Sequence, residues 1–386
     1  MTSDPGSFAR HTILERKPQI IRQVLADNTY APAVIAALEA LRDEIASRSI
    51  QPLVESGNDV PAWNNELAGH AGKTWLEIPW YFAESYFYRK LLEATGYFQP
   101  GAGQGCDPFG KQKEIQMVGD VQRLSSIWKQ IASLEPAGRF EALLHSSLWG
   151  NRADLSNFTV KEKARAGLET IAERALILID HTDQIRERLA GGLARLDFIC
   201  DNVGSDLLFD LALADFLLEL RWVQEIHLQL KGQPFFVSDA MPEDACHIVA
   251  LLKAVTNSEL QALGARLDAR LADGRLVFDT DPFWTSWKMF REMPVQVREQ
   301  IAYAGLVLLK GDVNYRRLLE DRHWPPTTRL ETVCDYFPAP FVALRTLKGE
   351  IMAGLQPGQA QALQAEDPTW LINGKRGIIQ LVMPGG

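Results

Sequence analysis

Apolar side chains recur every three or four positions through the first part of the chain, which is the spacing of amphipathic helices. The pattern is clearest over residues 20–25, 34–46 and 116–144. A Gly/Pro-rich loop interrupts it over residues 96–110, and no clear strand pattern occurs before about residue 175. We therefore expect a helical N-terminal region.

After residue 175 the pattern changes to short apolar runs separated by helical stretches. This alternation is typical of an α/β fold and predicts a mainly parallel sheet with helices on both faces. The predicted strands are residues 175–179, 196–200, 225–230, 235–237, 306–309 and 377–382. The predicted helices between them are residues 206–220, 245–255 and 258–272. We divide the chain into a helical region, residues 1–165, and an α/β domain, residues 166–386.

Several of the predicted strands end in a cluster of polar residues. In open α/β sheets, ligands bind in the crevice outside the carboxyl ends of the strands. If these strands are parallel neighbours, their polar ends converge on one crevice. The clusters are Asp180-His181, Asp201-Asn202, Ser238-Asp239 and the segment 310–316.

The residue types in these clusters favour a metal and a phosphate. Asp201, Asn202 and Asp239 offer two carboxylates and an amide oxygen, and hard cations such as Mg²⁺ or Mn²⁺ prefer oxygen ligands. Positive charge for phosphate oxygens would come from arginine and lysine side chains. Phosphoryl transfer needs mainly positioning and charge neutralisation, which such a set supplies. The candidate cations are Lys310, Arg316, Arg345 and Lys348.

Each of these residues also has a purely structural interpretation. An Asp-Asn pair after a strand is usually a turn or a helix N-cap. Asp239 is equally well explained as the cap of a helix that starts near Pro242. The pair Arg345 and Lys348 fits the surface of a helix.

Two further groups of residues are better explained by structure than by function. We expect Asp210 and Asp215 to cover the surface of a helix. The aromatic residues between positions 75 and 88 are expected in the core, because large aromatic side chains bury much apolar surface.

The net charge of the 386-residue chain is −9, from 40 basic and 49 acidic side chains. A protein that binds a polyanion needs a basic stripe. The short basic cluster of Lys161, Lys163 and Arg165 has acidic neighbours instead. Nucleic acid and anionic membranes are therefore not expected as main partners, whereas a small anionic substrate is compatible with the charge.

Cysteine usage and hydropathy place the protein in the cytoplasm. The four cysteines are far apart and form no CxxC pair, which argues against a disulfide framework or a structural zinc site. The first eight residues lack the basic-then-apolar order of a signal peptide. Acidic residues interrupt the most apolar segment, 207–220, which predicts a core helix and not a membrane span.

Several short segments occur in a characteristic order along nearly the whole chain. They are residues 6–9, 147–151 with 154–156, 197–204, 214–217, 236–239, 310–316, 345–348 and 354–359. Taken together in this order, they resemble the damage-control phosphatases, in the branch also named acidic residue methyltransferase. Any one segment is weakly specific, but their order and spacing are highly specific.

The resemblance implies a helical N-terminal region on a Rossmann-like α/β domain that binds one divalent metal, Mn²⁺, Co²⁺, Ni²⁺ or Mg²⁺. It implies that Asp201, Asn202 and Asp239 are the metal ligands and carry catalysis together with Lys348. It also implies that residues of the segment 312–316 and the RTxK motif contact the substrate. Those implied substrate contacts are Asp312, Asn314, Tyr315, Arg316 and Lys348, to which we add Arg345.

The chain departs from the family pattern at Ser205-Asp206, where relatives carry an aromatic residue and glutamate. Asp206 keeps a carboxylate but shortens it. From the sequence alone we add Asn151, with Asp154, as residues that line the crevice. An ordinary helix end capped by Asn151 explains that segment equally well.

Three functions compete for this pattern. The first is a metal-dependent phosphatase of small phosphorylated metabolites such as fructose 1-phosphate or fructose 6-phosphate, with attack by water or by a carboxylate such as Asp201. The second is an S-adenosylmethionine-dependent protein carboxyl methyltransferase. It is disfavoured because a nucleotide-type cofactor usually needs a Gly-rich turn and only Gly204 follows the strand. The third, a passive binding module, does not explain two carboxylates, an amide and several cations together.

Overall fold

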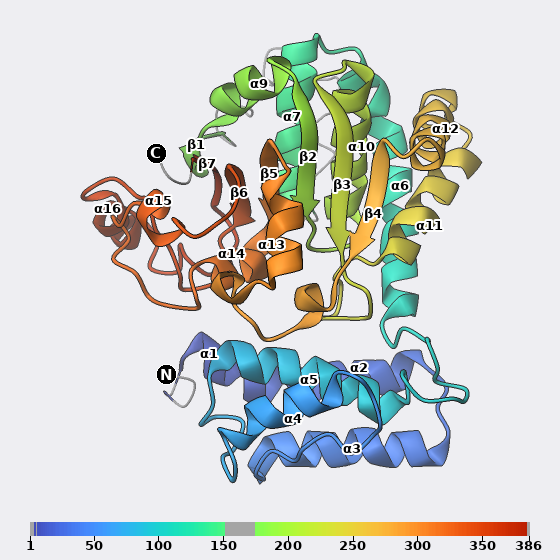
Figure 1. Cartoon of the computed structure of the whole chain (residues 1–386), viewed down its shortest axis with the longest axis vertical. Helices are drawn as coiled ribbons and strands as arrows, with labels where there is room; N and C mark the ends of the chain where they lie inside the picture. Colours follow the sequence, from blue (N-terminus) through green and yellow to red (C-terminus); the bar gives the residue numbers. More distant parts are fainter. Residues whose placement is uncertain (1–3, 5, 151–173, 384–386) are drawn as a thin grey trace. The chain divides into compact units, whose positions relative to one another are not determined.

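The computed structural model describes residues 4, 6–150 and 174–383 and divides into two compact units (Figure 1). The first unit comprises residues 1–114, 233–239 and 285–287. The second unit comprises residues 115–232, 240–284 and 288–386. The expected boundary at residue 165 therefore differs from the observed division, because residues 115–149 form helices that belong to the second unit.

The first unit is helical, as the apolar spacing predicts. Its longest helices, α3 and α5, pack against each other. Nearly every residue of α5 is buried, and the rings of Phe82 and Tyr86 stack with centroids 5.5 Å apart. The aromatic run is thus core, as expected. The elements are α1 (Phe8–His11), a π-helix (Thr12–Arg16), α2 (Lys17–Asp27), α3 (Pro32–Ser47), α4 (Val60–Ala68) and α5 (Trp80–Thr95).

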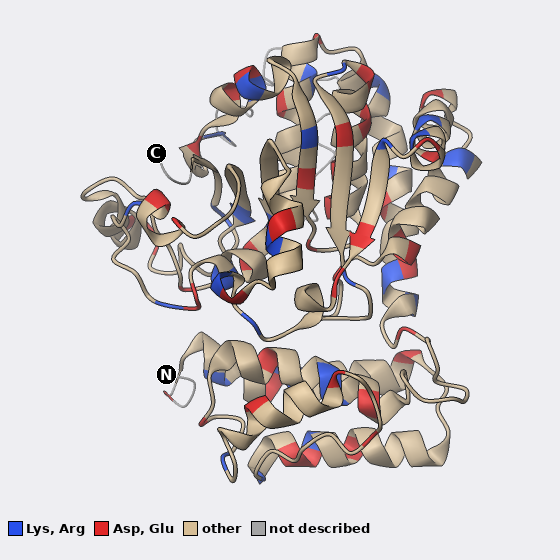
Figure 2. Cartoon of the chain, in the orientation of Figure 1, with Lys and Arg blue, Asp and Glu red and all other residues tan. Residues whose placement is uncertain are grey.

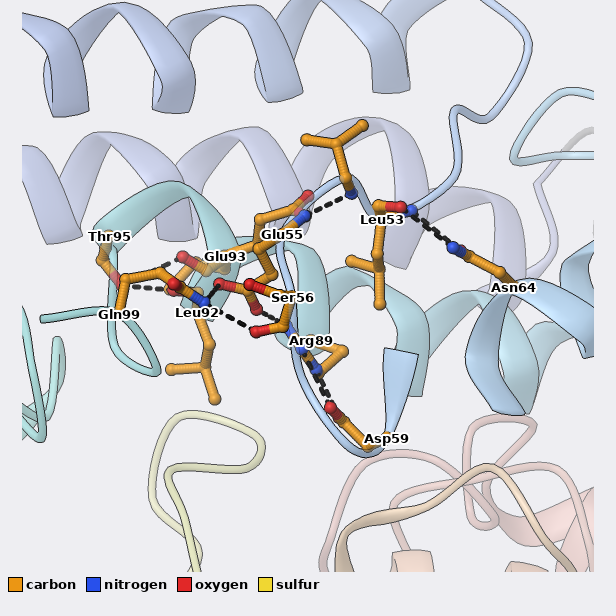
Figure 3. Close-up of polar contacts among 12 residues, drawn as sticks. Leu53, Glu55, Ser56, Asp59, Asn64, Arg89, Leu92, Glu93, Thr95 and Gln99 are labelled. Atoms are coloured by element: carbon orange, nitrogen blue, oxygen red, sulfur yellow. Dashed lines mark hydrogen bonds and ion pairs between the residues drawn. The ribbon is translucent and has the colours of Figure 1, made fainter. Parts of the chain in front are cut away.

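A charge cluster around the buried Arg89 connects the loop between α3 and α4 to α5 (Figure 3). The Nε atom of Arg89 lies 2.6 Å from Oδ2 of Asp59, and Nη1 lies 2.6 Å from Oε1 of Glu55. Glu93 accepts hydrogen bonds from the backbone amides of Val54 and Glu55, at 2.6 and 2.9 Å. Breaking one partner of a buried pair is costly, so these contacts make the loop an integral part of the unit.

A sheet forms the centre of the second unit, with the strand order β1-β7-β6-β5-β2-β3-β4. Neighbouring strands from β4 to β6 are parallel, whereas β7 is antiparallel to β6 and β1 is parallel to β7. The mainly parallel α/β sheet is therefore confirmed. The strands are β1 (Ile177–Asp180), β2 (Leu193–Ile199), β3 (Val223–Leu230), β4 (Leu276–Thr280), β5 (Leu306–Lys310), β6 (Phe341–Thr346) and β7 (Gly377–Val382).

Two details of the strand prediction are wrong. The apolar run Phe235–Val237 is a turn, in which Phe236 has a left-handed φ of 51°. Asp180 and His181 do not join the other polar clusters, because β1 runs opposite to β2, β3 and β5 and its carboxyl end lies at the other end of the sheet. Strands β4 and β6 had no counterpart in the prediction.

Helices cover both faces of the sheet, as predicted. On one face, Leu196 and Phe198 of β2 pack in a core with α6, α7, α10, α11 and α12. On the other face, Ile199 and Val307 pack with α13, α14 and α15. The helices are α6 (Gly110–Ala132), α7 (Pro136–Trp149), α9 (Thr182–Ala190), α10 (Ser205–Glu219), α11 (Pro242–Ala254), α12 (Ser258–Ala272), α13 (Val295–Ala302), α14 (Gly311–Leu318), α15 (Leu330–Val333) and α16 (Gln359–Glu366).

Helix α10 lies at the centre of the first of these cores and is buried all round. Asp210 and Asp215 are therefore buried, at 1% and 0% exposure, and the expectation that they cover a helix surface is wrong. Both are paired, as a buried carboxylate requires: Asp210 with Lys310, and Asp215 with Arg266 and Arg270. Among the described residues, no helix combines the length and apolar character that crossing a membrane requires.

Candidate functional site

The order of the strands creates a switch point between β2 and β5. From β2 the chain continues to β3 and β4 on one side, and then to β5 and β6 on the other side. In open α/β sheets the ligand crevice lies at such a point, outside the carboxyl ends of the strands. Helices α10 and α14 begin directly after these two strand ends, and helix N-termini favour anions. The backbone at the ends of β2 and β5 therefore favours an anionic ligand.

Two side chains from the β2–α10 connection and one from the first turn of α10 form a hydrogen-bonded cluster at the switch point. The amide nitrogen of Asn202 donates to Oδ2 of Asp201 at 2.8 Å and to Oδ2 of Asp206 at 3.0 Å. Burial raises the pKa of Asp206, against the lowering effect of the charge of Lys310, the hydrogen bond from Asn202 and the charge of Lys348. Because Asn202 uses its NH₂ group on the carboxylates, its side-chain oxygen is the atom suited to a cation.

Two glycines allow the backbone to approach this cluster. A Cβ atom on Gly311 would lie 1.9 Å from Oδ2 of Asp201, and one on Gly150 would lie 1.4 Å from Oδ1 of Asp206. Both glycines have positive φ, 84° and 45°, a conformation that side chains disfavour. The ends of β5 and α7 thus contact the two carboxylates directly.

Asn314 of α14 connects the ends of β2 and β5. Its Nδ2 donates to the backbone oxygens of Cys200 at 3.2 Å and Lys310 at 2.9 Å. Since both partners are acceptors, the orientation of the amide is determined. Its Oδ1 is buried and accepts no hydrogen bond from the part of the chain that the structure describes. A buried acceptor without a donor is a position for water or a ligand.

The chemistry of these donors fits a hard divalent cation. Asp201, Asn202 and Asp206 present carboxylate and amide oxygens, which Mg²⁺ and Mn²⁺ prefer. Across residues 4, 6–150 and 174–383, no group of three or more His, Cys, Asp or Glu side chains is arranged to hold a metal. The oxygen set at the switch point differs from such a group because it includes an asparagine.

Asp239, the third expected ligand, belongs to the first unit and is 2% exposed. In that unit the ring of Tyr88 packs on Phe236 with centroids 4.9 Å apart. Burial and the charges of Glu84 and Asp239 raise the pKa of Tyr88. In the second unit, the backbone amide of Ala240, the next residue along the chain, donates to the carbonyl oxygen of Asp201 at 2.8 Å.

Lys310 is not placed to bind a phosphate, contrary to the interpretation from the sequence. Its side chain is 3% exposed, and its Nζ donates to the backbone oxygen of Ser147 at 2.7 Å and to Oδ1 of Asp210 at 2.6 Å. Ser147 Oγ receives a further hydrogen bond from Nζ. Asp210 is a buried carboxylate that requires this cation, so Lys310 supports the site from within the core.

Arg345, Asp312 and Arg316 form a second buried network beneath the loop after β6. Nε of Arg345 lies 2.7 Å from Oδ1 of Asp312, and Nε of Arg316 lies 3.4 Å from Oδ2. Burial tends to raise the pKa of Asp312, but the charges of Arg345 and Arg316 outweigh it and lower the pKa. Arg345 is fully buried and also donates to the backbone oxygens of Ile351 and Gly349, at 2.5 and 3.0 Å.

The network orients the loop that carries Lys348. Tyr315 is buried beneath the guanidinium of Arg345, at 4.3 Å from the ring centroid. The backbone amide of Lys348 approaches Oδ1 of Asp312 at 3.4 Å, while its side chain is exposed. The charge of Lys348 acts on Asp206, which joins this loop electrostatically to the cluster at the switch point. Arg345 is in a strand and not on a helix surface.

Some site residues fall outside the prediction or outside the described chain. Asn151 and Asp154 lie beyond the described residues. The prediction missed Gln116 and Asp120 of α6, which lie against Gly204 in the β2–α10 connection. Polar residues at this spacing usually mark the solvent-facing side of a helix, so the sequence contains no signal that singles them out.

The fold and the site together define an α/β protein with carboxylate and amide oxygens beside two helix N-termini at the switch point of its sheet. The chain belongs to the damage-control phosphatase ARMT1-like domain family, whose model matches residues 12–363. Relatives named damage-control phosphatase ARMT1 are similar over almost their whole length. The mouse protein is 32% identical, with 99% of this chain and 97% of that protein covered. The human protein is 30% identical, with 98% and 96% covered.

A solved structure is also similar over most of its length. It is the crystal structure of a DUF89 family protein from Pyrococcus horikoshii, with 16% sequence identity and a TM-score of 0.46. The match covers 97% of this chain and 95% of that chain.

Membership of the damage-control phosphatases, a family that is generally metal-dependent, identifies the protein as a phosphatase that hydrolyses phosphoric monoesters.

Proposed function

We propose that this phosphatase is specific for small sugar phosphates, such as fructose 1-phosphate or fructose 6-phosphate, and uses one divalent cation. The observation that carries the proposal is the cluster of Asp201, Asn202 and Asp206 at the switch point, approached by two helix N-termini. A phosphate monoester needs a positive environment for its oxygens and a fixed orientation of its reacting bond. The helix ends, Lys348 and a cation held by the cluster would supply both.

Asp201 and Asn202, together with Asp239, would hold the cation. Asp239 is included on the resemblance of the segment 236–239 to the damage-control phosphatases. The bound cation, Mn²⁺, Co²⁺, Ni²⁺ or Mg²⁺, would supply positive charge to the phosphate oxygens. Asn202 keeps the carboxylate of Asp201 in place through its amide nitrogen.

Lys348 would bind a phosphate oxygen through its exposed ammonium group, as a point charge. The substrate contacts implied for Asp312, Asn314, Tyr315, Arg316 and Arg345 remain predictions. For the buried Arg345 and Tyr315, we propose that this role is indirect, through the position of the loop that carries Lys348. Hydrolysis breaks the phosphorus–oxygen ester bond, and one water is consumed for each alcohol and inorganic phosphate released.

Three other expectations belong to this proposal. The substrate is a small metabolite and not a nucleic acid or a membrane, in line with the net charge of −9. A cytoplasmic location is proposed on the sequence. The methyltransferase alternative is not favoured, because the relatives are named phosphatases and only Gly204 follows β2 before α10 begins.

The test is phosphate release from a panel of sugar phosphates by the full chain, with Mn²⁺ and with a chelator. We expect release that needs the metal, and a fall in kcat/KM of about 100-fold in Lys348→Met, because one charged contact is worth about 1.5–3 kcal/mol. Lys73→Met, an exposed lysine in a loop of the first unit, is the matched control and should be unaffected. Release that persists with the chelator, or an unaffected Lys348→Met, would contradict the proposed site.

A further inference from the structure

Two side chains of α6 lie against the β2–α10 connection, immediately after the Asp201-Asn202 pair. A Cβ atom on Gly204 would lie 2.3 Å from Nε2 of Gln116 and 2.6 Å from Oδ2 of Asp120. Gln116 and Asp120 are four residues apart and therefore on the same side of the helix. Gly204 has a φ of 73°, so the connection bends here and its backbone can come this close.

The surroundings of Asp120 are unusual for a buried carboxylate. It is 1% exposed, and neither of its oxygens accepts a hydrogen bond from any residue that the structure describes. Its ion-pair partner, Arg123, has a side chain that is 56% exposed. Buried carboxylates normally accept several hydrogen bonds.

The chemistry of this pair selects one class of ligand group. An ionised carboxylate only accepts hydrogen bonds, so it binds hydroxyl groups and repels a phosphate. Gln116 carries both a donor and an acceptor. A carboxylate beside an amide therefore suits the neighbouring hydroxyl groups of a polyol, and both side chains lie next to the residues at which the phosphate would react.

We infer that Gln116 and Asp120 recognise the hydroxyl groups of the substrate and make the enzyme specific for phosphate esters of polyols. The inference rests on the proposed function, since it concerns the alcohol part of the same substrate. Asp120 and Gln116 determine which ester is bound, whereas the cluster at the switch point and Lys348 act on the phosphate itself.

The experiment compares two esters with the same phosphate, fructose 1-phosphate and phenyl phosphate, which has no hydroxyl groups. The variants are Asp120→Asn and Gln116→Met, with Glu114→Gln as the control, because Glu114 is an exposed carboxylate on the same helix. For fructose 1-phosphate we expect kcat/KM to fall about 10- to 100-fold in Asp120→Asn, which loses a hydrogen bond to a charged group, and about 3- to 10-fold in Gln116→Met, which loses a neutral one. For phenyl phosphate kcat/KM should change much less in each variant, because this ester has no hydroxyl group for either side chain to bind.

A merely structural role of Asp120 would lower both activities in parallel, and that result would overturn the inference, as would an unchanged preference between the esters. Gln116→Met gives the same comparison if Asp120→Asn does not fold. If the wild-type enzyme releases phosphate from phenyl phosphate but does not prefer fructose 1-phosphate, the inference fails and the phosphatase remains. If the wild type releases phosphate from neither ester with Mn²⁺, Co²⁺, Ni²⁺ or Mg²⁺, the proposed function is wrong, and the inference that rests on it is wrong too.

Discussion

Lys310 is the last residue of β5, and Lys348 lies just after the neighbouring strand β6. The two lysines have different roles because their surroundings differ. Lys310 is buried with Asp210 and Ser147, whereas the side chain of Lys348 is exposed. In the sequence both are lysines close to the end of an apolar strand. Burial depends on α7 and α10, which lie far from Lys310 along the chain, so local patterns do not reveal it.

The buried pair predicts a non-additive effect on stability. Lys310→Met should lower the free energy of unfolding by about 3–5 kcal/mol, because it leaves the carboxylate of Asp210 buried without its cation. The double variant Lys310→Met/Asp210→Leu should recover most of that loss, since an apolar pair of similar volume is often tolerated. Denaturant unfolding of the two single variants and the double variant measures the coupling. Additive losses would show that the two side chains do not depend on each other.

His227 of β3 lies between two carboxylates on the polar face of β2, β3 and β4, where charged residues stand on the strands themselves (Figure 2). Burial tends to lower the pKa of His227, but the hydrogen bonds to Asp279 and Glu225 outweigh it and raise the pKa. The hydrogen bond from His227 lowers the pKa of Asp279. Because the pKa of His227 is raised and that of Asp279 is lowered, these hydrogen bonds stabilise the fold most between the unfolded-state pKa values of an aspartate and a histidine, about 3.9 and 6.5.

The stabilisation from His227 is complete below the pKa of an unfolded histidine, about 6.5, and is lost as the pH rises through the raised folded value. Between pH 6 and pH 8 the melting temperature of the wild type should fall by about 2 °C more than that of His227→Gln. The effect is small because Glu225 and Asp279 are 45% and 37% exposed and solvent screens the pair. Thermal unfolding across this pH range tests it, and parallel curves for the two proteins would contradict the role of His227.

At the scale of elements, the ends of β5 and β2 are in direct contact through a glycine. Alanine at position 311 would bring its Cβ to 1.9 Å from Oδ2 of Asp201. We expect Gly311→Ala to reduce phosphatase activity by at least about 100-fold, because a displacement of about 1 Å at the reacting groups is enough.

Gly274→Ala is the matched control for this variant. Gly274 has a similar φ, 78°, but its Cβ would meet no atom within 4 Å, so it carries the same backbone strain without the contact. Activity and thermal unfolding of both variants separate strain from contact. Equal activity in the two would show that the contact between Gly311 and Asp201 does not matter for the reaction.

The helices and the buried strands could be predicted from the sequence, but not every turn and edge strand. Helix α12 (Ser258–Ala272) matches its predicted range, because its apolar spacing and its Asn257 cap are local signals. Edge strand β4 contains a polar Asp279, and its pairing with β3 is a tertiary property. The apolar run at Phe236 predicts a strand, yet the backbone turns there with a left-handed φ. Short apolar runs are ambiguous in this way.

The candidate site could be predicted where its residues follow strand ends, and not where distant elements contribute. Asp201, Asn202 and the segment that begins at Lys310 lie at neighbouring strand ends, as expected from a parallel sheet. Asp120, contributed by a helix about eighty positions earlier in the chain, gives no local signal. Its position becomes visible only through the contact of α6 with Gly204.

In the whole molecule, the direction of the strands decides which polar clusters lie at the switch point. Asp180 ends β1 and Asp201 follows β2, but β1 runs opposite to β2 and β5. Asp201 therefore lies at the switch point and Asp180 does not. We therefore propose that the reaction takes place at the switch point between β2 and β5.

The most direct test of this claim is phosphate release by Asp201→Asn beside Asp180→Asn, measured with Mn²⁺ at saturating fructose 1-phosphate after both variants are shown to fold. We predict that Asp201→Asn lowers kcat by at least about 1,000-fold, as the loss of a group that stabilises charge in the transition state does. Asp180→Asn should stay within about threefold of the wild type, because its bonds to Arg174 and Thr182 are structural. Full activity in Asp201→Asn, or an equal loss in both variants, would contradict the location of the active site at the switch point.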